Sequence, residues 1–224
     1  MKRLALAIAA VALAGSASAA TVSSTFTNAF ATTEIAQTGS LAKFNTALGT
    51  LTSATFKLTG SILSNYSVTN NAAQAQTAEV LTQSNLDADS LGVNGNADIN
   101  ALLAVSPIII MQTSTGSQNY AAGQTRNFGP LQNNYMVGPS ALANLAALLG
   151  PGNIDVTCAT VTGITVFGGG GNISSTQNTQ AKCDGEIVYT FDPANRVPEP
   201  ASLGFLGLGL AAAGLMARRR ALKA

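Results

Sequence analysis

The densest group of metal-binding side chains lies between residues 87 and 98, where carboxylates and amides are interspersed with glycines. The candidate ligands are Asp87, Asp89, Asn94, Asn96 and Asp98. Calcium prefers oxygen ligands of this kind, so the segment is a candidate calcium site. The spacing does not match an EF-hand, because no glutamate closes the loop in the position that such a site needs. Turns favour Asp, Asn and Gly for backbone reasons, and a plain polar loop is the main alternative.

Most catalytic arrangements are excluded by composition. The chain contains no histidine, which rules out a Ser-His-Asp triad, a Cys-His pair and histidine metal ligands. The glycine run at 168–171 lacks the Lys-Ser/Thr pair of a phosphate-binding loop. Glycoside hydrolysis needs only two carboxylates, but no acid here stands in a recognisable acid–base context, and there is no Trp to stack on a sugar. We therefore expect no enzymatic activity and no cofactor other than the candidate calcium ion.

Cys158 and Cys183 are the two cysteines of the chain. In an exported protein, which both chain ends predict, a disulfide is the default state of such a pair. It would close a loop that holds the glycine run and the polar stretch 172–180, and would stabilise the fold by about 3–4 kcal/mol. We expect the disulfide to hold two strands together while the connection between them stays flexible. A catalytic thiol is the alternative, but it has no histidine to activate it.

The N-terminus has the three parts of a secretory signal peptide. Lys2 and Arg3 form a positive region, residues 4–14 are apolar, and residues 17–19 read Ala-Ser-Ala. This small-x-small pattern predicts cleavage by signal peptidase after Ala19.

The C-terminus joins a proline-rich motif, an apolar run at 201–217 and a basic cluster. The motif consists of Val197, Pro198, Glu199 and Pro200, and the cluster of Arg218, Arg219 and Arg220. Arginines are costly to move across a bilayer, so the cluster predicts a cytoplasmic stop. The run is short for a spanning helix, which suits a processing signal better than a permanent anchor.

This arrangement resembles the PEP-CTERM sorting signal of Gram-negative bacteria. The resemblance implies recognition by an exosortase, an inner-membrane protease-transpeptidase that removes the helix. The protein would reside transiently in the inner membrane and then reach the cell surface or extracellular matrix. A plain C-terminal membrane tail is the alternative. The chain thus divides into a signal peptide (1–19), an exported body (20–196) and a sorting segment (197–224).

The body carries few charges. It holds five basic and nine acidic residues, so its net charge is 5 − 9 = −4, although the whole chain is +1. It has no basic stripe, and nucleic-acid binding therefore has no electrostatic support. Its surface must consist largely of Thr, Ser, Asn and Gln, which is compatible with contact to hydrated polysaccharide.

Alternating and β-branched segments predict an all-β body, a jelly-roll-like β-sandwich with one or two short helices. The expected strands are 21–30, 50–59, 62–69, 107–111, 156–167 and 186–191, with Gly60 between the second and third. A helix is expected from Ser140, as N-cap, to Leu149, ended by Gly150-Pro151. Segment 72–80 is compatible with a short helix or a strand.

Residues 41–60 carry a second resemblance. Phe44, Leu48, Gly49 and Leu51 precede a Thr-rich strand in a phrase that resembles the opening of choice-of-anchor domains, type E most nearly. Ala54 stands where that family more often has Val, and Tyr189-Thr190-Phe191 partly matches its closing strand. The resemblance implies an exported β-rich module and no common activity.

Three functional classes remain. The first is a structural protein of the surface, exopolysaccharide or biofilm matrix, sorted by an exosortase. The second is a carbohydrate-binding or adhesive β-sandwich, with Tyr66, Tyr120 and Tyr135 as candidate stacking rings. The third is a self-assembling surface subunit, favoured by Asn/Gln/Thr-rich strands and low charge. We favour the first, because motifs rather than composition support it.

Overall fold

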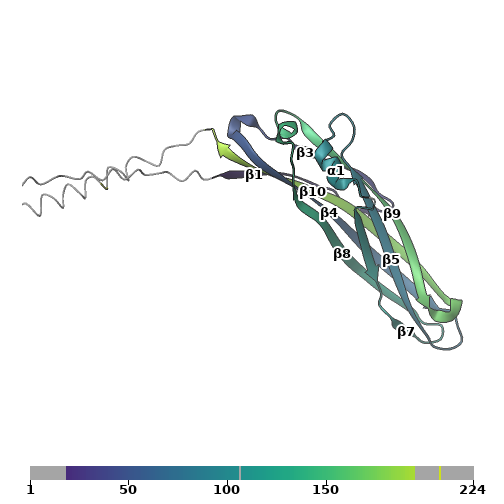
Figure 1. Cartoon of the computed structure of the whole chain (residues 1–224). Coiled ribbons are helices and arrows are strands. Elements are labelled where there is room, and N and C mark those ends of the chain that lie inside the picture. Colours follow the sequence, from purple (N-terminus) through teal and green to yellow (C-terminus); the bar gives the residue numbers. More distant parts are fainter. Residues whose placement is uncertain (1–18, 106, 195–206, 208–224) are drawn as a thin grey trace, which may run out of the picture.

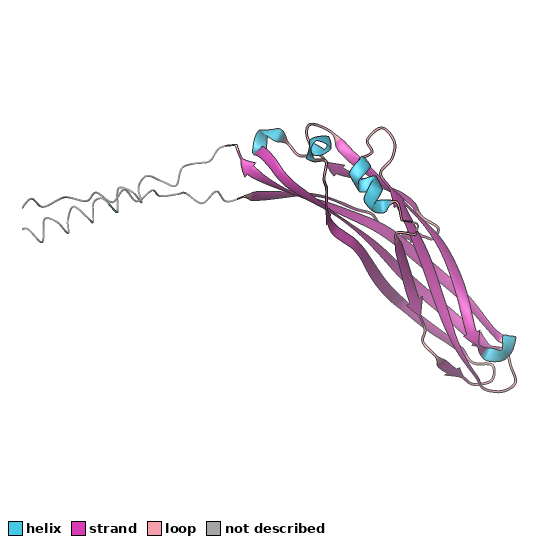
Figure 2. Cartoon of the chain, viewed as in Figure 1, coloured by secondary structure: helices cyan, strands magenta, loops and turns pink. Residues whose placement is uncertain are grey.

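The computed structural model describes residues 19–105, 107–194 and 207, which form an elongated sandwich of two sheets (Figures 1 and 2). Sheet A contains β1 (Ala20–Thr27), β10 (Ile173–Pro193), β4 (Gly49–Asn70) and β8 (Thr125–Ala141) in that order, with β2 (Ala31–Thr32) beside β10. Sheet B contains β3 (Ala36–Ala42), β9 (Asn153–Gly168), β5 (Gln76–Asp89) and β6 (Ile109–Ser114), with β7 (Gln118–Tyr120) beside β5.

The strand pairs within both sheets are antiparallel. The chain crosses repeatedly between the sheets, and the two strand orders are those of a jelly roll built from two Greek keys. The predicted all-β, jelly-roll-like sandwich is therefore confirmed.

Both described ends of the body lie at the same end of the sandwich, because Ala20 is the antiparallel partner of Phe191. We call this end the base, and the opposite end, at Gly169–Gly171, the tip (Figure 1). The 22 residues of β4 run from base to tip, a span of about 70 Å for an extended strand. The body is thus a rod that begins and ends at its base.

One continuous strand, β4, replaces the two strands expected at 50–59 and 62–69. Its inward alternation runs unbroken through Phe56, Leu58, Gly60 and Ile62. A Cβ on Gly60 would lie 3.0 Å from the Met111 sulfur of the opposite sheet. Glycine is present here because the sheets approach closely, and the prediction of an interruption was wrong.

The predicted helix from Ser140 to Leu149 is also wrong. Strand β8 continues to Ala141, because Ser140 pairs with Phe56 and Ala141 with Thr55. Only the 3₁₀ turn η2 (Leu145–Leu148) follows, with Asn144 rather than Ser140 as its cap. Sheet pairing has overridden the helical spacing of the leucines.

The flexible connection expected between the cysteines is ordered instead. Strands β9 and β10 extend to the tip and meet at the 3₁₀ turn η3 (Gly169–Gly171), so the polar stretch 172–180 is largely β10. Its residues pair with β4 from Ile173 to Gln180, which supplies backbone partners along the whole stretch. Segment 72–80, whose sequence is compatible with a short helix or a strand, contains the start of β5 at Gln76.

The core lies between the inner faces of the sheets. Its fully buried side chains near the base and middle include Leu41, Leu58, Ile62, Leu86, Met111, Ile154 and Ile187. A smaller cluster of Tyr66, Val68, Ala78, Val80 and Tyr120 fills the tip. Within residues 19–105, 107–194 and 207, no helix has the length and apolar character needed to cross a bilayer.

Candidate functional site

The segment proposed for calcium is a loop built around a short helix. Asn96 caps α1 (Ala97–Leu103), and its Oδ1 atom accepts hydrogen bonds from the backbone N–H groups of Asp98 and Ile99 at 3.1 Å each. Ile99 and Leu103, one turn apart, are buried. The cap and this spacing are the signal by which the helix could have been found, although the sequence analysis missed it.

Asp155 of β9, which the sequence analysis also missed, holds this loop against the sandwich. Its carboxylate accepts hydrogen bonds from the Ser40 hydroxyl at 2.5 Å and from the Asn94 amide at 2.9 Å. Its backbone N–H donates to the Asn94 carbonyl, and its own carbonyl accepts from the Ser90 hydroxyl. The Ser40 bond first, and the Asn94 bond second, lower the pKa of Asp155 below its ordinary value.

The five candidate calcium ligands do not converge. Asp89 accepts from the Leu91 N–H at 3.3 Å, while the Oδ2 atom of Asp98 accepts from the Asn144 N–H at 2.5 Å. Asp87 lies on β5 opposite Ala159. The Asn94 amide donates to Asp155, and the Asn96 side chain caps α1. Among the residues that the structure describes, no three acidic, Cys or His side chains are grouped so as to hold a metal ion. The oxygens of this loop form turns and caps in the structure.

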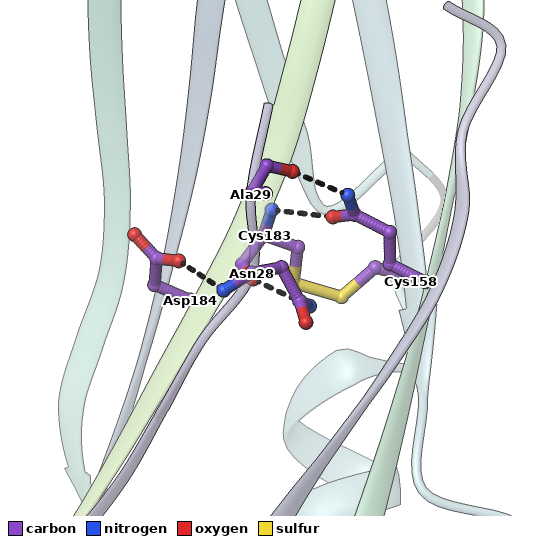
Figure 3. Close-up of a disulfide and its surroundings, with 6 residues drawn as sticks. Asn28, Ala29, Cys158, Cys183 and Asp184 are labelled. Carbon is purple, nitrogen blue, oxygen red and sulfur yellow. Dashed lines mark hydrogen bonds between the residues drawn. A yellow bond between two sulfur atoms is a disulfide. The ribbon is translucent and has the colours of Figure 1, made fainter. Parts of the chain in front are cut away.

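The predicted disulfide is confirmed and joins the two sheets (Figure 3). Cys158 lies on β9 of sheet B and Cys183 on β10 of sheet A, with their Cα atoms 6.4 Å apart. Both cysteines are buried. A loop of 25 residues is closed, which stabilises the fold by about 3.5 kcal/mol in the chain-entropy model.

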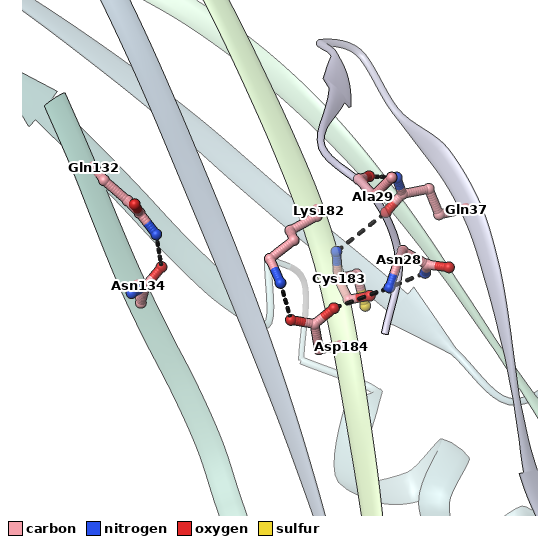
Figure 4. A network of polar contacts seen from close by, with 8 residues as sticks. All are labelled: Asn28, Ala29, Gln37, Gln132, Asn134, Lys182, Cys183 and Asp184. Carbon is pink, nitrogen blue, oxygen red and sulfur yellow. Dashed lines mark hydrogen bonds and ion pairs between the residues drawn. The ribbon is translucent and has the colours of Figure 1, made fainter. Parts of the chain in front are cut away.

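A polar clamp of Asn28, Gln37 and Asp184 surrounds this cross-link (Figures 3 and 4). The Gln37 side chain accepts from the Cys183 N–H at 3.1 Å and donates to the Ala29 carbonyl at 2.8 Å. Asn28 donates its backbone N–H to Asp184 and its side-chain amide to the Cys183 carbonyl. The clamp replaces sheet pairing in the gap between β1, which ends opposite Asp184, and β2, which pairs with Ala181.

Two of the three tyrosines proposed as sugar-stacking rings are inside the tip. Tyr66 and Tyr120 are buried, and the Tyr66 hydroxyl contacts Thr113. Burial raises the pKa of Tyr120, while the Arg126 guanidinium, 5.7 Å from its ring centre, opposes that rise. The stacking hypothesis is therefore wrong for Tyr66 and Tyr120. Only Tyr135 of the three is exposed, at 41%.

The outer face of sheet A has a shallow hollow of about 420 Å³ near the tip. Its lining side chains on that face are mainly amides and hydroxyls: Asn65, Ser67, Asn127, Thr176 and Asn178. They come from β4, β8 and β10, next to an irregularity in the β4–β8 pairing between Ser64 and Tyr66. Such a surface can donate and accept hydrogen bonds, but it presents no charged group.

The sorting segment predicted at 197–224 lies outside the described residues apart from Gly207, and so does the predicted signal peptide apart from Ala19. The PEP-CTERM protein-sorting motif matches residues 196–220. Fold and motif together define an exported β-sandwich that passes through a membrane-anchored sorting step. The chain therefore carries a PEP-CTERM sorting motif at its C-terminal segment, and this motif implies processing by an exosortase.

The choice-of-anchor resemblance is not confirmed, and no curated protein matches the chain. A chain from the structure of the infectious bursal disease virus Gx strain is similar at 12% identity with a TM-score of 0.19, covering 97% of this chain and 55% of that one. A chain from T=1 particles derived from infectious bursal virus is similar at 10% identity, with a TM-score of 0.16 and coverage of 85% and 47%. This chain spans about half the length of those viral chains.

Proposed function

We propose that the body is a structural component of the cell surface or exopolysaccharide matrix of a Gram-negative bacterium, released from the inner membrane by an exosortase. The sorting motif at 196–220 is the observation that carries this proposal. It assigns the protein to export and leaves the folded body outside the cytoplasm.

The geometry of the body supports this role. Because Ala20 pairs with Phe191, the sorting segment leaves the sandwich at its base. During sorting, the tip would therefore point away from the membrane, about 70 Å from it. The inter-sheet disulfide and the small number of charges suit an oxidising, polysaccharide-rich environment. We propose no catalytic role, since the chain lacks histidine and no charged side chain lines the described hollow on sheet A.

Intact mass measured on envelope and medium fractions tests the sorting step. In cells with the sorting protease, we expect loss of the segment beyond about Pro200, and in cells without it, retention. Glu199→Gln alters the motif and should block this loss. Glu186→Gln makes the same change on the folded body, where Glu186 pairs with Lys57, and should be processed normally. An unprocessed C-terminus in both strains would identify the tail as a permanent anchor and overturn the sorting step.

Fractionation of the same cells tests the matrix role. We expect the processed protein in the exopolysaccharide fraction, retained through washes that remove soluble periplasmic proteins. Recovery of processed protein only as a freely soluble species would leave the sorting step intact and overturn the matrix role.

Binding of hydrated polysaccharide is a second candidate function, and the uncharged polar hollow on sheet A favours it. A pull-down on the cell's own polysaccharide tests this function. Asn178→Ala within the hollow should reduce retention, whereas Asn134→Ala, on β8 outside it, should not. No retention of the unaltered protein would remove this candidate.

A further inference from the structure

Towards the tip, each sheet lacks a strand on the same side of the sandwich. Strand β3 covers β9 only from Asn153 to Ala159, although β9 continues to Gly168. Strands β1 and β2 cover β10 only from Gln180 to Phe191, although β10 starts at Ile173. Residues 160–168 of β9 and 173–179 of β10 are therefore sheet edges, with no further strand beside them in the described part of the chain.

The residues just before β3 make the last contacts with β9 and show where its open edge begins. The Thr160 N–H donates to the Ile35 carbonyl, and the Thr162 N–H donates to the Glu34 carboxylate at 3.3 Å. Alternate residues of a strand direct their backbone groups to the same edge. Beyond Thr162, the backbone N–H and carbonyl groups of Ile164 and Val166 are directed to this edge. None of the described segments pairs with them on this side.

Apolar side chains are exposed along this edge. Ile164 and Val166 face the interior of the sandwich yet are 40% and 38% exposed. Their neighbours on β5, Thr82 and Val80, are fully buried on the same face. On the outer face, Val161 and Phe167 are 60% and 51% exposed. The interior of the sandwich is therefore accessible to solvent where sheet B lacks a strand beside β9.

The strand residues that form this edge carry none of the features by which proteins block strand pairing. Residues 160–181 contain no charged residue and no proline. By contrast β8, at the other edge of sheet A, contains Pro130, Pro139 and Arg126 and has two irregularities in its pairing. Charges, prolines and bulges are the usual protection of a free strand.

We propose that residues 160–168 of β9 pair antiparallel with the same edge of a second copy of this chain. Pairing centred on Ile164 would place Ile164 opposite its own copy and Val161 opposite Phe167 of the partner, while Val166 would lie opposite Thr162. A two-fold interface of this kind is self-complementary, and no like charges oppose each other in it. The two B sheets would join into one sheet that spans both molecules.

A second copy fits this edge better than a charged partner, because a neutral strand offers no electrostatic selectivity. Among the described residues, Glu34 is the one charged group bonded to this edge, and its carboxylate must leave the Thr162 N–H when the partner strand arrives. A single pair of strand edges makes a small interface, so we expect a weak, concentration-dependent dimer. The proposal goes beyond the matrix role and does not depend on exosortase processing.

Sedimentation of the purified exported protein over a range of concentrations tests the proposal. We expect a monomer–dimer equilibrium that Ile164→Lys weakens about tenfold or more, because two lysines would face each other at the centre of the pair. Val93→Lys is the control, since Val93 is fully exposed in the loop before α1, and should leave the equilibrium unchanged. A monomer at every concentration, or a dimer that Ile164→Lys leaves intact, would overturn the proposal.

Cross-linking gives an answer that does not require a disruptive charge. Directly opposed residues that exchange backbone hydrogen bonds have Cα atoms about 5.5 Å apart, within disulfide range. Ile164→Cys should therefore form a covalent dimer under mild oxidation, whereas Val93→Cys should form none above background. Equal cross-linking of the two variants would reject the register centred on Ile164.

Discussion

The ring of Phe26 occupies the space that a side chain on Gly185 would need. A Cβ atom on Gly185, the antiparallel partner of Phe26, would lie 2.3 Å from the ring. A Cβ on Gly39 of the other sheet would lie 2.1 Å from the same ring. One aromatic side chain of β1 thus fills the gap between β10 and β3, and two glycines make room for it.

Gly185→Ala should lower the free energy of unfolding by about 1–3 kcal/mol, because the Phe26 ring must move from its buried position. Denaturant unfolding measures this change. Gly163→Ala is the matched control, since Gly163 is also in a strand and a Cβ there meets nothing within 4 Å. A loss of stability that is equal in the two variants would show that strand glycines, and not the Phe26 contact, determine the effect.

Gln37 should contribute more to stability than its half-exposed position suggests. Gln37→Ala would leave the Cys183 N–H without its acceptor beside the buried disulfide, and we expect a loss of about 2 kcal/mol. Gln132→Ala removes a glutamine on the exposed face of β8, where its partner is Asn134 (Figure 4), and should change stability by less than about 0.5 kcal/mol. Thermal unfolding of both variants gives the comparison, and similar losses would remove the special role of the clamp.

Substitution of Asn96 tests whether this residue acts as a helix cap or as a metal ligand. Because its Oδ1 atom is bonded to two N–H groups of α1, Asn96→Ala should cost about 1 kcal/mol whether or not calcium is present. Unfolding is measured in chelator and again in about millimolar calcium. A cost that grows substantially with calcium would restore the calcium site proposed from the sequence.

Alternation of residue types was sufficient to predict the sandwich and five of its ten described strands, namely β1, β4, β6, β9 and β10. The inward positions of β4 from Phe56 to Val68 are one example, and export signals and cysteine number predicted the disulfide. Sequence reasoning failed where the cause lies in a distant contact. The reason for Gly60 is the side chain of Met111 on the opposite sheet, and Ser140 is held in a strand by Phe56. The spacing of residues along the sequence does not reveal these contacts.

The candidate site shows the same limit. Residues 87–98 were recognised as an unusual cluster of oxygen atoms, but the structure distributes those oxygens among turns, a helix cap and Asp155. That aspartate is 61 residues from Asn94 in the chain and 115 from Ser40. No local pattern marks it, because the pairing of β9 with β3 and β5 brings the three residues together.

Asp155 should make the stability of the protein depend on pH in the acid range. Its pKa is lowered in the folded state by the Ser40 and Asn94 hydrogen bonds, so the unfolded state takes up a proton first as the pH falls. The contribution of these bonds is therefore complete above the ordinary pKa of an aspartate, about 4, and is lost as the pH falls through the lower folded-state value.

Asp155→Asn removes the titrating group. We expect the unaltered protein to be more stable than this variant at about pH 7, and the difference to shrink below about pH 4. Urea unfolding at a series of pH values measures the difference, with Asp89→Asn as the control, because it removes a nearby charge without touching the Ser40 and Asn94 bonds. A gap between the unaltered protein and Asp155→Asn that stays constant down to about pH 3 would mean that these hydrogen bonds do not discriminate between the charged and neutral carboxyl.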